Sequence, residues 1–225
     1  MIKDHQQEFN QFQVILDAIV IIISYGLAWL LMINGFVPTR GDPLRSEFYL
    51  MALLIVIPVY LLLYAVFQLY TPKRVQGRRL EFANICKANA IGLLMFTLVL
   101  YLISKNPFWY NFSRPMVLYF FVINIVLETV ERNLIRMVLR SMRARGYNLK
   151  HVLLVGYSRA AEGYIDRVKQ NPEWGYHIAG ILDDQKALGE EYKGIRVLGK
   201  IQDLQSILDM NVLDEIAITL RIDEF

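Results

Sequence analysis

The sequence predicts a membrane α-helical bundle of four transmembrane helices, followed by a small α/β domain with a parallel sheet. The chain is 55% hydrophobic and only 20% charged, which is more apolar than soluble proteins of this size usually are. Apolar segments of membrane-spanning length fill its first part, and short strand and helix patterns alternate from Lys150 onward. We therefore expect a transmembrane domain with a cytoplasmic stalk at residues 1–146 and a cytoplasmic α/β domain at residues 147–225, truncated at its C-terminal end.

Length and composition predict the first three spans. Residues 12–33 are apolar apart from a few polar side chains such as Asp17, residues 48–70 carry no charge, and residues 88–104 extend back to about Ile85. Each segment has close to the roughly 20 residues that a helix needs to cross about 30 Å of hydrocarbon. Pro58 predicts a kink in the second span.

The fourth predicted span is short. Its uncharged part, residues 115–127, would reach only about 20 Å as a helix. Apolar residues then recur at three-and-four spacing among charged ones, so we expect the helix to continue as an amphipathic stalk that ends near Gly146. Glu128 and Arg132 form an i, i+4 pair that we expect on an exposed face at the membrane interface, where Asp17 is also expected. The alternative for Glu128 is an intramembrane carboxylate site.

Basic residues predict the orientation of these spans, because loops rich in Lys and Arg stay on the cytoplasmic side. The loop between the second and third spans has four basic residues and each of the other loops has two: Lys73, Arg74, Arg78 and Arg79, against Arg40 with Arg45 and Lys105 with Arg114. The middle loop is therefore expected in the cytoplasm. With an even number of spans, both termini and the α/β domain are then cytoplasmic.

The remainder of the chain alternates strand and helix patterns. We expect strands at residues 151–155, 176–182, 196–198 and 215–220, and helices at residues 160–170 and 201–210. This alternation favours a parallel sheet with right-handed crossovers.

The turn after the first of these strands is the candidate ligand site. An apolar run that ends in Gly156 and opens into a helix is typical of a Rossmann-like mononucleotide half. Ser158 stands where a second glycine would let pyrophosphate approach, Arg159 lies at the helix N-terminus that attracts anions, and Asp183 follows Gly156 by 27 residues, where a ribose-binding acid sits. The alternative is a turn that only joins strand to helix, with an acidic residue that ends a strand.

Several classes of site are not expected. Cys86 is the single cysteine, which excludes an intrachain disulfide and a cysteine-based zinc site. The three histidines are scattered without a second ligand at metal spacing, so no metal site is expected. The net charge of +3 is too small and too dispersed to indicate a nucleic-acid partner. No hydrolase, Walker or zinc-protease motif is present, so we expect no catalytic residue.

Five short segments carry a resemblance to a known family. They are His151 to Gly156, Asn171-Pro172-Glu173-Trp174-Gly175-Tyr176, Gly180 to Asp184, Gly194 to Gly199, and Asp214 to Ile216. With four spans and an arginine-rich stalk before them, these segments make the chain similar to the N-terminal half of bacterial polyprenyl-phosphate glycosylphosphotransferases of the exopolysaccharide type. The resemblance covers nearly the whole chain.

This resemblance implies the membrane-anchoring and regulatory part of an enzyme. Such transferases move a sugar 1-phosphate from a UDP-sugar to undecaprenyl phosphate, with magnesium, at the cytoplasmic face of the bacterial inner membrane, in exopolysaccharide or capsule biosynthesis. That chemistry belongs to a C-terminal domain with a membrane-inserted helix and an Asp-Glu pair, and nothing in this sequence corresponds to it. The resemblance implies no cofactor in this chain, Mg²⁺ for the catalytic domain that is absent, and the lipid bilayer as a partner.

Two other interpretations stay open. Membrane-bound nucleotide-sugar dehydratases resemble the same N-terminal arrangement, although the segment from Asn171 to Tyr176 is more similar to the transferases. A non-enzymatic membrane module that senses a ligand is the other. UDP-sugar and undecaprenyl phosphate would bind through the absent domain, and self-association stays open.

Overall fold

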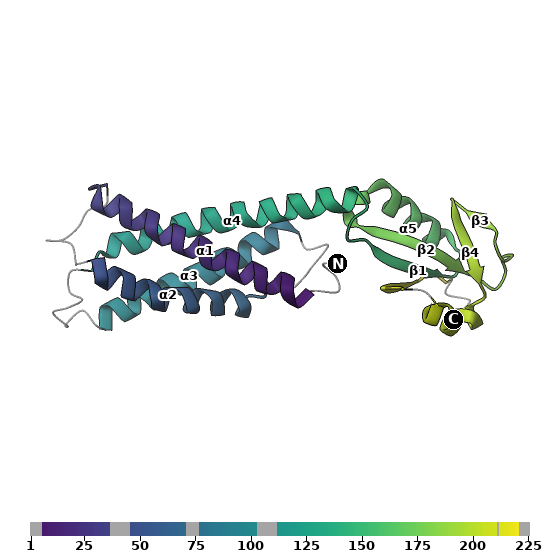
Figure 1. Cartoon of the computed structure of the whole chain (residues 1–225), viewed down its shortest axis with the longest axis horizontal. Helices are drawn as coiled ribbons and strands as arrows, with labels where there is room; N and C mark the ends of the chain where they lie inside the picture. Colours follow the sequence, from purple (N-terminus) through teal and green to yellow (C-terminus); the bar gives the residue numbers. More distant parts are fainter. Residues whose placement is uncertain (1–5, 37–45, 71–76, 103–111, 211, 221–225) are drawn as a thin grey trace. The chain divides into compact units, whose positions relative to one another are not determined.

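The computed structural model describes residues 6–36, 46–70, 77–102, 112–210 and 212–220, and it divides the chain into two compact units (Figure 1). Residues 2–135 form a helical unit, and the residues from Arg136 onward form an α/β unit. The division falls inside one long helix rather than after it, so the last turns of that helix belong with the α/β domain. The domain limits 1–146 and 147–225 stay a prediction.

The helical unit contains α1 (Gln6–Ile33), α2 (Ser46–Val66), α3 (Arg78–Leu102) and most of α4 (Arg114–Ala144). Pro58 lies inside α2, and α2 ends at Val66 rather than at Tyr70. α3 begins more than two turns before the apolar run, so Arg78 and Arg79 start a helix and are not in the loop where we expected them. The Asn84 side chain donates to the Phe67 carbonyl, which fixes this early turn beside the end of α2.

Three of the described helices are long and apolar enough to cross a membrane, namely Phe9–Ile33, Ser46–Val66 and Arg78–Leu102. The expected fourth span is not among them, because α4 carries Glu128, Glu131 and Arg132 within its apolar half. The helical part is therefore compatible with a membrane protein, with three candidate spans among the described helices.

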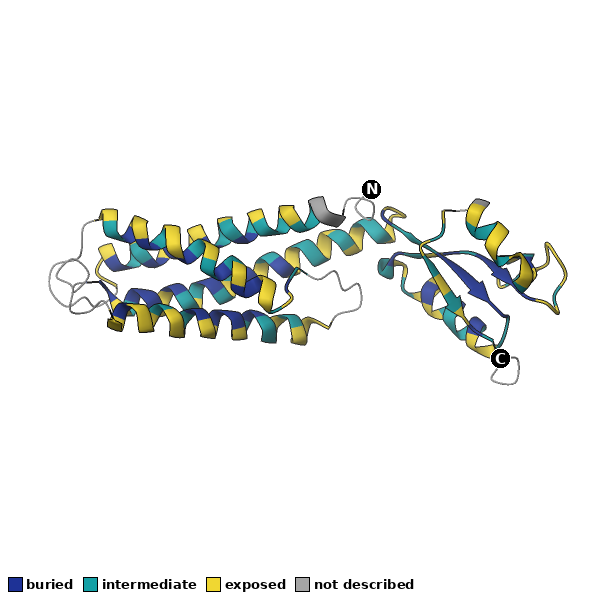
Figure 2. Ribbon diagram, turned by 90° about the horizontal axis from the view of Figure 1, so that it is seen from below, coloured by how far each residue is buried: buried dark blue, intermediate teal, exposed yellow. Residues whose placement is uncertain are grey.

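The core of the helical unit is rich in aromatic side chains. Tyr49, Tyr60, Tyr64, Met116 and Phe120 are fully buried, and the Tyr60 and Phe120 rings meet edge to face with centroids 5.3 Å apart. Exposed residues lie along the outer faces of the helices (Figure 2), and many of them are large and apolar. An apolar exterior is what lipid favours, so this surface is compatible with a membrane protein.

The α/β unit has a five-stranded mixed sheet in the order β3-β4-β2-β1-β5. The strands are β1 (Lys150–Val155), β2 (Tyr176–Leu182), β3 (Glu191–Tyr192), β4 (Ile195–Gly199) and β5 (Glu215–Ile218). β1 pairs in parallel with β2 and β5, and β2 with β4, as expected. The short β3 is antiparallel to β4 and was not predicted, because two residues are too few for a periodic pattern. The prediction of a purely parallel sheet was therefore wrong at this edge.

Helices cover both faces of the sheet. Val152 and Leu154 of β1 pack with α5 (Arg159–Gln170), and Leu153 and Val155 lie in a second cluster with residues of α6 (Leu204–Met210). Alternate residues of β1 thus pack into hydrophobic cores on opposite faces of the sheet, which explains why consecutive residues of this strand are apolar. Two short 3₁₀ helices, Pro172–Trp174 and Ile201–Asp203, complete the unit, and the second replaces the start of the predicted helix 201–210.

Candidate functional sites

The turn between β1 and α5 lies where ligands bind in open α/β sheets. In the sheet, β2 lies on one side of β1 and β5 lies on the other side. The carboxyl ends of β1 and β5 therefore mark the topological switch point, which is the usual place for a nucleotide. The structure brings the predicted residues Gly156, Ser158 and Asp183 together at this point.

Gly156 serves the packing of the turn. Its φ is +87°, and a Cβ atom there would lie 2.6 Å from Leu220 Cδ2 and 3.0 Å from Leu220 Cα. The chain that follows β5 thus occupies the space beside the glycine. The glycine is needed for a left-handed conformation and a close approach of protein to protein, whereas the fingerprint uses its glycines to admit a phosphate.

Ser158 is the N-cap of α5. Its Oγ accepts a hydrogen bond from the Ala160 N–H at 3.1 Å and donates one to the Thr219 carbonyl. The serine therefore satisfies a free N–H of the first turn and ties α5 to the end of β5. Arg159, the first residue of the helix, is exposed.

Asp183 binds the protein's own backbone. It is buried, its Oδ2 accepts from the Tyr157 N–H at 2.7 Å, and its Oδ1 accepts from the Gln185 N–H at 2.8 Å. The carboxylate thus takes up an N–H of the turn that a phosphate would need, and it brings a negative charge to that turn. These contacts favour the interpretation that the turn is structural.

Sequence reasoning missed an aromatic group beside this turn. The rings of Tyr157 and Tyr192 lie 4.4 Å apart, and Lys186 Nζ is 4.8 Å from the centroid of Tyr192. A hydrogen bond with Glu190 raises the pKa of Tyr192 to about 12, so its ring is neutral at physiological pH. Tyr192 lies on the unpredicted β3, so no sequence signal pointed to the pair.

A second group of polar side chains lies inside the helical unit. Arg132 of α4 donates through Nη2 to Asp17 Oδ2 of α1 at 2.6 Å, and its Nε lies 3.4 Å from Glu131 Oε2. Asp17 is 0% exposed, Glu128 1% and Arg132 4%. The expectation of an exposed Glu128–Arg132 pair was wrong, because α4 turns its charged face toward the other helices. Asp17 is buried among the helices, and its position at the membrane interface stays a prediction.

Amides and a phenol extend this polar face. The Asn124 Nδ2 group donates to the Tyr64 hydroxyl and to Asn89 Oδ1, each at 2.8 Å, and Asn89 Nδ2 donates to the Ile85 carbonyl. Asn124, Glu128 and Glu131 follow one another at i+4 and i+3 on α4, so they share one side of the helix. That spacing on α4, together with the lone carboxylate of Asp17 in the apolar α1, was the signal from which this group could have been predicted.

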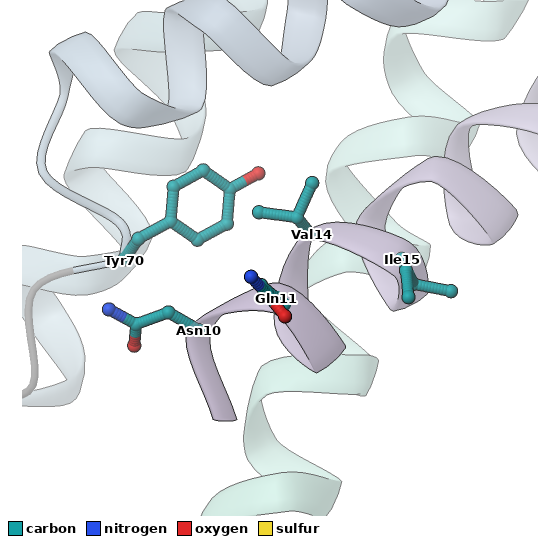
Figure 3. Close-up of a pocket in the computed structure, with 5 residues that line it drawn as sticks. All are labelled: Asn10, Gln11, Val14, Ile15 and Tyr70. Carbon is teal, nitrogen blue, oxygen red and sulfur yellow. The ribbon is translucent and has the colours of Figure 1, made fainter. Parts of the chain in front are cut away.

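A pocket lies close to this group. It is lined by Asn10, Gln11, Val14 and Ile15 of α1 and by Tyr70, whose hydroxyl points toward Val14 (Figure 3). The Tyr70 ring centroid lies 5.7 Å from Arg132 Cζ. One wall of the pocket is therefore also a neighbour of the buried charges.

Comparison with known proteins gives the family. Residues 65–225 match the family described as a CoA-binding domain. The chain belongs to this family. Its domains are found in sugar-transferase-like and polysaccharide-biosynthesis proteins. The match begins at the end of α2 and includes α3, α4 and the α/β unit, so it joins membrane-type helices and a sheet in one domain. No curated protein matches the chain.

Proposed function

We propose that this chain is the membrane-anchoring and regulatory part of a sugar transferase that moves a sugar 1-phosphate from a UDP-sugar to undecaprenyl phosphate. The observation that carries the proposal is the family match over residues 65–225, because that domain occurs in sugar-transferase-like proteins and here includes membrane-type helices. The five segments of resemblance lie within the matched range and support the same assignment. Neither described group of side chains has an arrangement suited to phosphoryl transfer.

The anchoring role follows from α4. This helix is continuous from Arg114 to Ala144, and its last turns belong to the α/β unit. There the Arg143 side chain packs against Gly175, where a Cβ atom would lie 2.8 Å from Arg143 Cδ. A helix whose first part packs with apolar helices and whose last turns belong to the α/β unit supports the anchoring role that we propose.

We also propose that α4 is a fourth span. Its residues Met116, Val117 and Phe120 are buried in the core of the helical unit, whereas Leu118, Val122, Val126 and Val130 are exposed. The apolar side chains thus face outward and the charged ones inward, which suits a helix in lipid despite its charges. Four spans would place both termini on the same side, in the cytoplasm of a bacterium.

Cysteine labelling in intact cells tests this topology. A cysteine in place of Asn111 should react with a membrane-impermeant reagent, and one in place of Gln76 should be protected; both positions lie outside the described residues. The reverse pattern would contradict the orientation, and equal reactivity of both would contradict the crossing of α3, which separates them. A cysteine in place of Gln170, exposed at the end of α5, tests the fourth span: it should be protected, and labelling as strong as that at position 111 would contradict that span.

The transferase assignment is tested by reading the gene past the codon for Phe225 and by assay. Membranes that contain the whole gene product, given a labelled UDP-sugar, undecaprenyl phosphate and Mg²⁺, should release UMP. Membranes that contain residues 1–225 alone should release none above background. UMP release by residues 1–225, or a dehydratase domain beyond Phe225, would contradict the proposal.

A ligand-binding role for the α/β unit is the second candidate. The family description and the Tyr157–Tyr192–Lys186 group favour it, because stacked rings and a cation beside the switch point offer a surface for a nucleotide. Titration of the whole chain with CoA distinguishes the two roles. Micromolar binding that Lys186→Ala weakens would support a sensor, and the absence of binding would support a spacer.

A further inference from the structure

The buried charges of the helical unit do not balance. Asp17, Glu128 and Glu131 lie so that one carboxylate oxygen of each is within 4.8 Å of the others. Arg132 is in contact with Asp17 and Glu131. With all three carboxylates ionised, they and this guanidinium leave two negative charges, and Glu81 adds to the negative field at Glu131. An uncompensated charge is very unfavourable away from water, so a compensating positive charge is required.

Several polar atoms of the same group are buried without a hydrogen-bond partner among the described residues. They include Asp17 Oδ1 and both oxygens of Glu128 and Glu131, as well as Arg132 Nε and Nη1. Arg132 Nε lies 3.4 Å from Glu131 Oε2, as an ion pair without hydrogen-bond geometry. Tyr64 and Asp17 are near enough to Glu128 to interact with it, and the Tyr64 hydroxyl, which accepts from Asn124, still has its O–H to donate to Glu128. Buried polar atoms without partners are rare in folded proteins, and a bound ion is one recognised explanation of them.

We propose that Asp17, Glu128 and Glu131 hold one hard divalent cation inside the helical bundle. A charge of +2 balances the two excess negative charges. Oxygen-only ligands select cations such as Mg²⁺, Ca²⁺ and Mn²⁺ over softer metals. Oxygens on opposite sides of Ca²⁺ are about 4.6–5.2 Å apart, so the observed spacing of up to 4.8 Å suits an ion of that size.

Arg132 and the cation would use different atoms of the same carboxylate. Arg132 Nη2 bonds to Asp17 Oδ2, and Asp17 Oδ1 is the oxygen without a partner. Asn124 Oδ1 also lacks a hydrogen-bond partner among the described residues, and Asn124 lies on the same side of α4 as Glu128. Its amide oxygen is therefore available as a further ligand. The cation would join α1 to α4 without displacing the ion pair.

The pocket at Tyr70 lies beside α1, the helix that carries Asp17. Asn10 and Gln11 line it seven and six residues before Asp17 on α1, which corresponds to about 10 Å of helix rise. Tyr70 lines the pocket (Figure 3). The same side chain interacts with Asp17 and Arg132, so the pocket and the carboxylate group share a neighbour.

Two protons are the competing explanation. They would balance the charge equally well, but they would supply only two donors for the five carboxylate oxygens without a partner. A cation contacts several oxygens at once. The two explanations differ in what they predict for metal binding.

Mn²⁺ is the probe, because its paramagnetic resonance signal falls when it binds. The whole chain, purified in mild detergent and freed of metal with EDTA, should bind one Mn²⁺ per chain, and Ca²⁺ should compete. Mn²⁺ should also raise the temperature at which the helices unfold, since an ion that binds the folded state stabilises it.

Glu128→Gln should weaken Mn²⁺ binding by at least about tenfold, because it removes one charged ligand and keeps the side-chain shape. Glu131→Gln should do the same, so the test stands if one variant fails to fold. Glu47→Gln, in the first turn of α2 and exposed, is the matched control and should bind as the unchanged chain does. The proposal would be overturned in favour of protons if the unchanged chain bound no Mn²⁺. It would also be overturned if Glu128→Gln and Glu131→Gln both bound Mn²⁺ as tightly as the unchanged chain does.

Discussion

The two units differ in whether their buried polar groups have hydrogen-bond partners within the protein. At the β1–α5 turn, Ser158 and Asp183 bond to backbone groups of the same domain. Inside the helical unit, three carboxylates keep oxygens that have no hydrogen-bond partner among the described residues. At the β1–α5 turn, which resembles a ligand site, the polar groups are therefore hydrogen-bonded within the protein. In the helical unit, which has no recognised motif, several carboxylate oxygens are not.

This difference indicates where an external ligand has most to gain. A ligand at the turn would have to replace hydrogen bonds that already exist, so its net gain is small. A cation between the carboxylates would satisfy atoms that folding leaves unpaired. A sequence motif alone does not show that a ligand binds, whereas buried atoms without hydrogen-bond partners show where a ligand would add interactions.

The largest expected effect is at the buried ion pair. Arg132→Met should lower the free energy of unfolding of the helical unit by about 3–5 kcal/mol, because it leaves Asp17 charged and buried without its partner. Denaturation of the whole chain in detergent, followed by a spectroscopic signal from the helices, measures this change.

Lys193→Met is the matched control for the α/β unit. Lys193 pairs with Asp166, but both side chains are substantially exposed, at 34% and 49%. Exposed pairs contribute about 0–1 kcal/mol. Equal effects of Arg132→Met and Lys193→Met would show that water reaches the Arg132 pair and would remove the contrast between the two units.

The next effect concerns the packing of the turn. Gly156→Ala should destabilise the α/β unit by about 2–4 kcal/mol, since its φ is +87° and the new Cβ would meet Leu220. Gly163→Ala in α5 is the control, because no atom lies within 4 Å of its Cβ position. It should stabilise by about 0.5–1 kcal/mol. Hydrogen exchange of the β1 amides in the whole chain measures both, and a tolerated Gly156→Ala would reopen the ligand interpretation.

Sequence patterns predicted the elements better than the sites. Val152 to Val155 had to form a central strand, because four consecutive apolar residues bounded by a glycine fit a strand covered on both faces. The inward position of Glu128 and Arg132 was not predictable in the same way. It depends on the contact with Asp17, 115 residues away from Arg132, which a local pattern does not contain.

The roles of the turn residues required the structure for a similar reason. Gly156, Ser158 and Asp183 lie at the same edge of the sheet, since parallel strands end there. Their partners are backbone atoms of Tyr157, Gln185 and Thr219. Spacing along the sequence shows which residues meet, but it does not show whether they bind a ligand or each other.

A smaller effect is expected at Asp183. Asp183→Asn should cost about 1–2 kcal/mol of stability, because the amide keeps one acceptor oxygen for the Tyr157 and Gln185 N–H groups and turns a donor toward the other. Asp184→Asn is the neighbouring control: Asp184 is exposed and accepts only from the Ile201 N–H among the hydrogen bonds of the described residues. Its cost should stay below about 1 kcal/mol. A stable Asp183→Asn chain would show that this carboxylate is free for a ribose.

The smallest effect is expected at Arg159. A helix N-terminus with an arginine favours an anion by a fraction of a kcal/mol up to about 2 kcal/mol, but the Tyr157 N–H already donates to Asp183 and the Ala160 N–H to Ser158. A phosphate would therefore meet few free donors and one like charge. We expect CoA, NAD and UDP-sugars to bind the whole chain with Kd above about 1 mM, which corresponds to less than about 4 kcal/mol, and Arg159→Ala to change this less than about twofold. Calorimetry would contradict this expectation if it showed micromolar binding that Arg159→Ala or Gly156→Val abolished, since the turn would then bind a ligand in spite of its internal hydrogen bonds.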